Sequence, residues 1–243
     1  MGCDVTITMT VTIGTIPCKR FHLAYVRYGW KDRAARSCEE RGGRVPVRPG
    51  EAIDPEATRN RILEVSEDLF YRRGICPVGI TEIADAAEAS KMSIYRYFGS
   101  KDGLVKAALS YRSDRVHRWL AEGLAHVAPG PQRVLAVFDL LTDWFREERF
   151  RGCAMVSAAT EDRGSGGAPT LLARAHLQTY RELLARCLTE AGVDCPESLA
   201  RQLLILIEGS TVISAVDGDP AAGTDARRVA EALLAAARPA ASA

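Results

Sequence analysis

A chain of 243 residues, 47% hydrophobic and 26% charged, is long enough for two small helical domains that share one body. Its net charge of +1 excludes recognition of nucleic acid through overall charge, so any such role depends on where individual cations lie. Seven cysteines without a CxxC pair exclude a zinc site or disulfide framework, and no apolar run reaches the roughly 20 residues of a membrane-spanning helix.

The first 53 residues differ from the rest. Residues 1–50 carry nine Lys or Arg against four Asp or Glu. Apolar residues alternate with threonine over Val5–Ile13, as in a strand, but no second strand follows to pair with it. Residues 31–50 are basic and contain Gly and Pro without periodicity. We predict a disordered extension over 1–53, which is either a basic arm that contacts nucleic acid or a leader upstream of a later start.

From Asp54 onward the pattern is helical. Ile62, Val65 and Leu69 form one apolar stripe, and a run of two arginines and a glycine at 72–74 ends the helix. Two short helices are predicted at 80–87 and 91–98. A long helix begins after the N-cap Ser100, and the others are predicted at 131–148, 152–162, 168–192, 196–216 and 224–237. The predicted fold class is therefore all-α, with 54–100 as a three-helix helix-turn-helix domain and 101–240 as a second helical domain.

The two short helices predict a helix-turn-helix unit. Ala84, Ala87 and Ala89 are small enough for two helices to cross closely at a large angle. Such a unit presents its second helix outward, and a helix has the right width for the DNA major groove. The residues of this segment that we expect to be exposed are Lys91, Met92, Ser93, Arg96, Tyr97 and Lys101. From charge and spacing alone, a small solvated helix in a bundle is an equally good interpretation.

The run SKMSIYRYFGSKDGL, residues 90–104, closely resembles the recognition-helix signature of TetR-family repressors. The resemblance is specific over 59–105 and consistent in helix number and length to the end of the chain. It implies that Tyr95 and Tyr97 contact phosphates or base edges and that Lys101 contacts a phosphate. It also implies that Lys91, Met92, Ser93 and Arg96 face the bases, and that Ser90 caps the recognition helix and touches the DNA backbone.

Two positions depart from the family pattern. Val78 and Gly79 stand where a Ser or Thr cap usually precedes the second helix, so we assign the missing hydroxyl contact to Thr81. Glu88 stands where the family usually has Gly in the turn. If that position requires positive φ, Glu88 costs about 1 kcal/mol there. We therefore expect modest DNA affinity.

The resemblance also implies an effector-binding and dimerisation domain over 101–240. The segment 196–216 is apolar on nearly all sides and 224–237 has one apolar face, which predicts a homodimer through both. The bulky candidates for contact with the effector are Trp119, Phe138, Trp144, Met155, His176 and Tyr180. Aromatic residues at helical spacing are more often core than ligand contacts, and a lone His is more often a satisfied core residue than a metal ligand. No metal or cofactor is expected.

These features predict a cytoplasmic, dimeric repressor of a pseudopalindromic operator in double-stranded DNA, released by a small-molecule effector through a population shift that the helix after Ser100 transmits. The alternative is a helical module that binds a ligand or partner and has lost specific DNA binding. We expect no enzyme, since the sequence has no nucleophile–base pair, Gly-rich phosphate loop or paired metal-ligand spacing. The sequence leaves open which effector and which operator bind, and whether the protein represses or activates.

Overall fold

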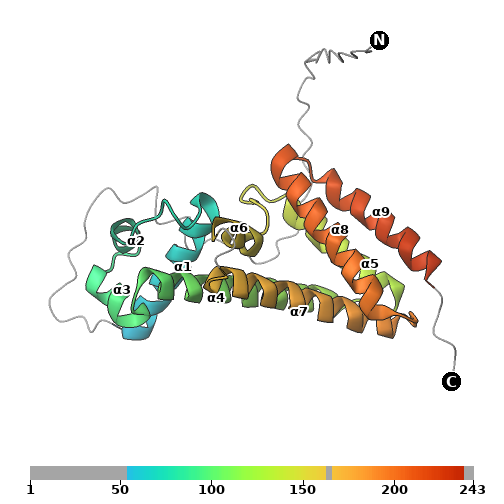
Figure 1. Cartoon of the computed structure of the whole chain (residues 1–243), viewed down its shortest axis with the longest axis horizontal. Helices are drawn as coiled ribbons and strands as arrows, with labels where there is room; N and C mark the ends of the chain where they lie inside the picture. Colours follow the sequence, from blue (N-terminus) through green and yellow to red (C-terminus); the bar gives the residue numbers. More distant parts are fainter. Residues whose placement is uncertain (1–53, 163–165, 238–243) are drawn as a thin grey trace, which may run out of the picture. The chain divides into compact units, whose positions relative to one another are not determined.

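The chain divides into two units, residues 1–47 and 48–243. The computed structural model describes residues 54–162 and 166–237, all in the second unit. The predicted extension over 1–53 lies outside these residues. The described residues form nine helices and no β-strand, which confirms the predicted all-α fold. Figure 1 shows the order of the helices.

The first three helices form a compact unit. Helix α1 (Pro55–Arg73) begins where the Asp54 carboxylate accepts a hydrogen bond of 2.9 Å from the Glu56 N–H, and it ends at Gly74, whose φ is 85°. Helices α2 (Ile80–Ala86) and α3 (Lys91–Phe98) follow. Fully buried isoleucines from all three helices, Ile62, Ile83 and Ile94, join them. Apolar burial therefore holds α3 in place while its other side stays free.

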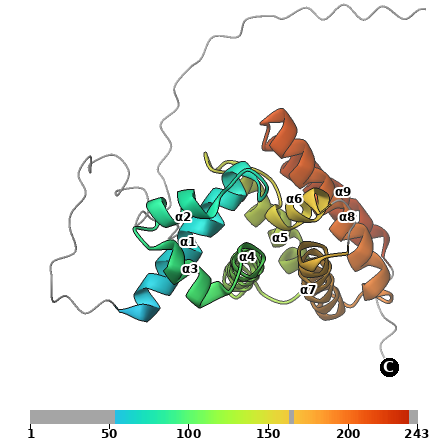
Figure 2. The ribbon, with the colours of Figure 1, turned by 60° about the vertical axis from the view of Figure 1, so that its left-hand side comes forward.

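Two long helices connect this three-helix unit to the rest. Helix α4 (Lys101–Leu124) and helix α7 (Ala168–Glu190) lie side by side in both views (Figures 1 and 2). The short helix α6 (Ala154–Glu161) packs on both of them, next to the three-helix unit. The Ser100 hydroxyl caps α4 by accepting from the Gly103 N–H at 3.0 Å. The predicted N-cap is thus confirmed.

The remaining helices, α5 (Pro131–Phe145), α8 (Pro196–Asp217) and α9 (Ala221–Ala236), pack together beyond α6. Gly223 lets α9 approach α5 closely, since a Cβ there would lie 2.3 Å from Thr142 Oγ1. The prediction placed these helices correctly, although α5 ends three residues earlier than predicted and α9 begins three residues earlier.

Two apolar clusters fill the described part of the chain, and α4 contributes to both. The first contains the three-helix unit together with Leu104 and Leu109 of α4, and Met155 and Ala158 of α6. The second contains Leu120 and Leu124 of α4 with α5, α7, α8 and α9. The core of the three-helix unit thus extends past residue 100, where the sequence placed the domain boundary, because α6 packs on it.

Candidate DNA-binding face and effector cavity

The turn between α2 and α3 does require a positive φ at the position of Glu88. Glu88 has φ of 48° and is the only non-glycine residue with positive φ among the described residues. No side chain caps α2, because Gly79 is its N-cap residue. Both departures from the family pattern therefore have structural consequences, a strained turn and a helix start without a hydroxyl.

Helix α3 presents a continuous exposed face. Its N-cap is Ser90, whose hydroxyl accepts from the Ser93 N–H at 3.0 Å and lies 2.9 Å from the Ser93 hydroxyl. Met92 is 75% exposed and Tyr95 is 47% exposed, although both are large apolar side chains. Lys91 and Arg96 are exposed as well, and Ser93 is half-buried. This face combines cations, hydroxyls and an apolar side chain, the groups that contact base edges in a major groove.

Tyr97 is held beside Arg96. The Arg96 guanidinium donates to the Tyr97 hydroxyl at 3.3 Å and lies 5.1 Å from the centroid of its ring. The Tyr97 ring also packs edge-on against Phe98. These contacts restrict the rotamers of two side chains predicted to contact DNA, and restriction before binding lowers the entropy cost of binding.

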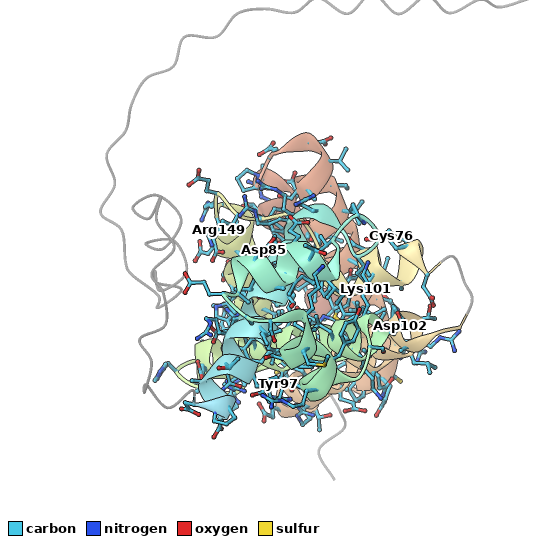
Figure 3. All side chains as sticks on the ribbon, turned by 90° about the vertical axis from the view of Figure 1, so that its left-hand side faces the viewer. Cys76, Asp85, Tyr97, Lys101, Asp102 and Arg149 are labelled. Carbon is cyan, nitrogen blue, oxygen red and sulfur yellow. The ribbon has the colours of Figure 1, made fainter. Side chains whose placement is uncertain are left out.

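Lys101 contacts the loop between α1 and α2, residues 74–79, called here the α1–α2 loop. Its ammonium group donates to the Ile75 carbonyl at 2.9 Å and lies 3.4 Å from the Cys76 carbonyl. Figure 3 looks onto the three-helix unit and labels Lys101, Cys76 and Tyr97. The sequence assigned Lys101 to a phosphate and did not foresee this internal role. Thr81, the predicted substitute for the missing hydroxyl, is exposed on α2.

The same loop is held from the other side by Glu161 at the end of α6. Its carboxylate accepts from the Ile75 N–H at 2.9 Å and from the Cys76 N–H at 3.1 Å. A Cβ at Gly74 would lie 2.8 Å from Glu161 Oε1, so glycine is needed there for close approach as well as for its φ of 85°. A single carboxylate therefore ties α6 to the three-helix unit through charge-assisted hydrogen bonds.

A buried ion pair joins α1 to α4. The Arg112 guanidinium pairs with the Glu67 carboxylate, and both side chains are only 7% exposed. The guanidinium also lies 3.5 Å from the centroid of the Tyr71 ring. Arg115 contacts the second oxygen of Glu67 at 3.3 Å. The tyrosine hydroxyl in turn accepts from the Arg151 N–H at 2.7 Å, so this group of side chains extends from α1 to the segment before α6.

Behind α6 lies a cavity of ≈ 20 Å³, called here the α6–α8 cavity. Four residues predicted to contact an effector line it, namely Trp144, Met155, His176 and Tyr180. Phe138 is fully buried in the second apolar cluster and Trp119 packs against that cluster, so neither lines the cavity. The lining residues that the sequence analysis did not name are Arg112, Val116, Cys153, Ala154, Ile207, Glu208 and Thr211.

The half-buried His117 packs against two buried residues of the cavity lining, His176 and Tyr180. The rings of His117 and His176 are 4.5 Å apart, and that of Tyr180 lies 4.9 Å from His117. His176 Nδ1 is hydrogen bonded to the Ser113 hydroxyl at 2.8 Å. Burial, together with the charges of His117 and Arg112, lowers the pKa of His176 to about 3, so this ring is neutral.

Glu208 is the acidic residue of the cavity lining. Its Oε2 is shielded from solvent and has no hydrogen-bond partner among residues 54–162 and 166–237. Burial raises the pKa of Glu208 to about 7. The same carboxylate contributes to the raised pKa values of the Cys153 thiol and the Tyr180 hydroxyl, although burial is the larger cause for both. A single Glu inside the apolar run LLILIEGSTVI was the sequence signal for this residue.

A second cavity, of ≈ 240 Å³, lies between α1, α4 and α6 and is called here the α1–α6 cavity. Its walls include Glu67, Tyr71 and Glu161. Arg112 and Ala154 line both cavities. The first turn of α6 therefore stands between the α6–α8 cavity and the side chains that hold the three-helix unit. In the described residues, no group of three or more His, Cys, Asp or Glu side chains is placed to hold a metal ion.

One face of α8 is apolar and exposed. Ile205 is 72% exposed, Val216 is 78% exposed, and Val212 and Ile213 are each about half exposed. Gly209 lies in the same stretch, and a Cβ added there would meet no atom within 4 Å. By length and composition α8 alone among the described helices resembles a membrane span, and 44% of that stretch is buried inside the molecule. An apolar stripe of this extent on an otherwise packed helix is typical of a protein–protein interface.

Comparison with known proteins gives a consistent result. Residues 62–108 match the family described as bacterial regulatory proteins, tetR family. The chain is 31% identical over 150 residues to the HTH-type transcriptional repressor NemR of Escherichia coli, covering 56% of this chain and 73% of NemR. It is 24% identical over 177 residues to the HTH-type transcriptional regulator YjdC of Escherichia coli, covering 72% and 93%. The crystal structure of SCO4454, a TetR-family transcriptional regulator from Streptomyces coelicolor, superposes with a TM-score of 0.69 at 26% identity, covering 75% and 96%.

Proposed function

The chain belongs to the TetR family of helix-turn-helix transcriptional regulators, and from this premise we propose that it is a homodimeric repressor that leaves its operator when a small molecule occupies the α6–α8 cavity. The observation that carries the proposal is the outward face of α3, where Lys91, Met92, Tyr95 and Arg96 are exposed side by side. Repression is proposed because NemR is a repressor. A cytoplasmic location follows from the same function.

The dimer is proposed to form through α8 and α9. The exposed stripe on α8 consists of Ile205, Val212, Ile213 and Val216, and α9 adds one large exposed apolar side chain, Val229, which is 46% exposed. Gly209 in the middle of this stripe supports a close helix–helix approach with the partner. A two-fold axis there would place two α3 helices on successive major grooves of a pseudopalindrome, about 34–36 Å apart or a multiple of that.

Helix α6 is proposed to transmit the signal together with α4. Its first turn lines the α6–α8 cavity with Ala154 and Met155, and its last residue, Glu161, holds the α1–α2 loop. The cavity holds only a water-sized group in this conformation, so an effector must displace its walls. Displacement of α6 would loosen the Glu161 contact and change the placement of α3. The sequence analysis assigned this transmission to α4 alone.

Selection of DNA from a random pool by the full chain tests the proposal. We expect an enriched pseudopalindrome, bound by two protomers, with an affinity that falls steeply as salt concentration rises. If no sequence is enriched, the chain is a ligand-binding module that has lost specific DNA binding, and the proposal is wrong.

The dimer is tested separately. Val212→Asp places an unpaired charge in the exposed stripe and should give monomers in sedimentation equilibrium, with the same helical content by circular dichroism. Arg201→Asp, which introduces the same residue on the same helix at a position that is already polar, is the control. A dimer that survives Val212→Asp with unchanged affinity would contradict an interface on this face.

A further inference from the structure

We propose that the effector carries a positive charge, as an ammonium or alkylammonium group, which binds between the Glu208 carboxylate and the rings of Trp144 and Tyr180. The inference rests on the proposed function, because it gives the chemistry of the ligand for the α6–α8 cavity. It concerns binding to the protein alone and is therefore tested without DNA.

The first argument is the unpaired carboxylate. An ionised carboxylate removed from water is costly unless a cation or several hydrogen bonds compensate it. Glu208 lines the cavity, and its Oε2 is shielded from solvent without any partner in the described residues. A ligand cation that occupies the cavity would supply the missing partner. Ligand binding would then restore an interaction that the protein lacks by itself.

The second argument is that no cation of the described chain does this. Arg112 also lines the cavity, but its guanidinium is taken by the Glu67 carboxylate and stacks on Tyr71. Among the described residues Arg112 forms its ion pair with Glu67 and forms none with Glu208. His176 is neutral, because burial and nearby positive charge lower its pKa to about 3. Once it is ionised, the Glu208 carboxylate therefore has no ion-pair partner among the described residues.

The third argument is the shape and lining of the space. Its volume of ≈ 20 Å³ admits one water-sized group, so an alkylammonium head enters only when the walls move apart, as proposed above for the effector. Trp144 is half-buried and Tyr180 is 3% exposed, and aromatic faces attract a desolvated cation. Val116 and Ile207 add apolar walls for the alkyl groups. An anionic head group would be repelled by Glu208. Arg112, the lining residue that could pair with an anion, is already bound to Glu67 and stacked on Tyr71.

A matched pair of ligands tests the charge. We would titrate the full-length dimer with benzyltrimethylammonium and with its neutral carbon isostere, neopentylbenzene, by calorimetry at pH 8. We expect the cation to bind about tenfold or more tightly than the isostere, and benzenesulfonate to bind more weakly than both. Equal affinities for the first two, or tighter binding of benzenesulfonate, would overturn the proposal without any variant.

The variant Glu208→Gln keeps the shape and removes the charge. It should bind the cation about tenfold less tightly than the natural protein while its affinity for neopentylbenzene changes less than twofold. It folds as well as the natural protein or better, since it removes a buried unpaired charge, and thermal unfolding checks this. Glu197→Gln, at an exposed position of the same helix, is the control and should retain the preference. Full retention of cation affinity in Glu208→Gln contradicts the assignment.

The pH dependence gives an independent readout. The charge of benzyltrimethylammonium does not change with pH, so its affinity should rise severalfold from pH 6 to pH 8 as Glu208 ionises. The other titratable or charged groups that line the cavity are Cys153, Tyr180, His176 and Arg112. The Cys153 thiol and the Tyr180 hydroxyl stay neutral because their pKa values are raised, His176 stays neutral because its pKa is lowered to about 3, and Arg112 is paired with Glu67. In Glu208→Gln the rise should disappear. Enrichment of an operator together with no preference for the cation would overturn this inference alone, whereas failure to enrich DNA would overturn the proposed function.

Discussion

The Arg112 guanidinium lies 3.5 Å from the centroid of the Tyr71 ring and forms a buried ion pair with Glu67, so one side chain of α4 is fastened to two residues of α1. The same side chain lines both cavities. Arg112 therefore stands where the three-helix unit, α6 and the α6–α8 cavity meet. Arg112 thus links α4 directly to α1, the helix that packs on α2 and α3.

The buried ion pair gives the first prediction. Glu67→Gln leaves the Arg112 guanidinium buried without its carboxylate and should lower the free energy of unfolding by about 3 kcal/mol. Replacing both partners, Glu67→Leu with Arg112→Met, should cost less than either single change, because the buried carboxylate and the buried guanidinium are removed together. Urea unfolding of the two single variants and the double variant measures the coupling. A double variant as unstable as the sum of the single ones would show that the pair does not interact.

The second prediction concerns the contact of Glu161 with the α1–α2 loop. Glu161→Gln retains one acceptor but loses the charge, and should cost about 1–2 kcal/mol of stability, the scale of a charged hydrogen bond. It should also weaken operator binding and reduce the further loss that an effector causes. Glu148→Gln, at an exposed position in the segment between α5 and α6, is the matched control. Operator affinity measured by fluorescence anisotropy, unchanged in Glu161→Gln, would exclude α6 from signal transmission.

Glu88 gives a prediction in the opposite direction. Its φ of 48° favours glycine, so Glu88→Gly should stabilise the protein by about 1 kcal/mol and raise its DNA affinity by removing a negative charge near phosphate. Ala86→Gly, in the last turn of α2, should instead cost up to about 1 kcal/mol. Thermal unfolding of both variants checks the sign. Destabilisation by Glu88→Gly would mean that the glutamate side chain makes a contact worth more than the strain.

The fourth prediction separates two cations near the DNA-binding face. Arg96 is exposed on α3, so Arg96→Ala should weaken operator binding much more than binding to random DNA. Lys101→Ala should lower both, and should also destabilise the protein by about 1 kcal/mol, because the ammonium group holds the Ile75 carbonyl at 2.9 Å. Anisotropy titrations with operator and scrambled DNA separate the two effects. Equal losses on both DNAs for Arg96→Ala would refute contact with the bases.

The fifth prediction is a pH dependence of stability. The pKa of Glu208 is raised from 4.5 to about 7, so the folded protein holds a proton that the unfolded chain releases. Stability from this residue is fully present below pH 4.5 and is lost as pH rises to about 7. His176 acts in the opposite sense: its pKa is lowered from 6.5 to about 3, so stability is present above pH 6.5 and is lost as pH falls toward 3.

Glu208→Gln isolates the acidic residue. At pH 8 the variant should be more stable than the natural protein by about 2 kcal/mol. The full pKa shift of Glu208 corresponds to roughly 3 kcal/mol, but Glu208 is partly exposed and solvent screening reduces the effect. At pH 5 the difference should be small. Urea unfolding at both pH values, with Glu197→Gln as the control, measures it. A stability difference that does not depend on pH would show that the carboxyl titrates normally.

The local features of the fold were determined by the sequence by itself. The Ser90 and Ser100 caps and the glycine start of α2 follow from residues within a few positions of each other, since caps depend on short-range geometry. Exposure was predicted correctly for Lys91, Met92 and Arg96, whereas Ser93, Tyr97 and Lys101 are half-buried. The resemblance over 59–105 predicted the family for the same reason, because the motif is contiguous. The sequence also indicated that Glu88 would be strained if its position required a positive φ, and the structure shows that φ is 48° there.

Only the tertiary structure decided which side chains connect these parts. Glu161 accepts a hydrogen bond from the Ile75 N–H, 86 residues away in the sequence, and Arg112 pairs with Glu67, 45 residues away. Glu208 lines the same cavity as Trp144. Helical spacing tells which face of a helix is apolar but not which neighbour covers it. Of the six effector candidates that the sequence named, Trp144, Met155, His176 and Tyr180 line the cavity, whereas Phe138 and Trp119 belong to the core or pack against it. Contact with an effector stays a prediction for all six, and the sequence did not single out Glu208.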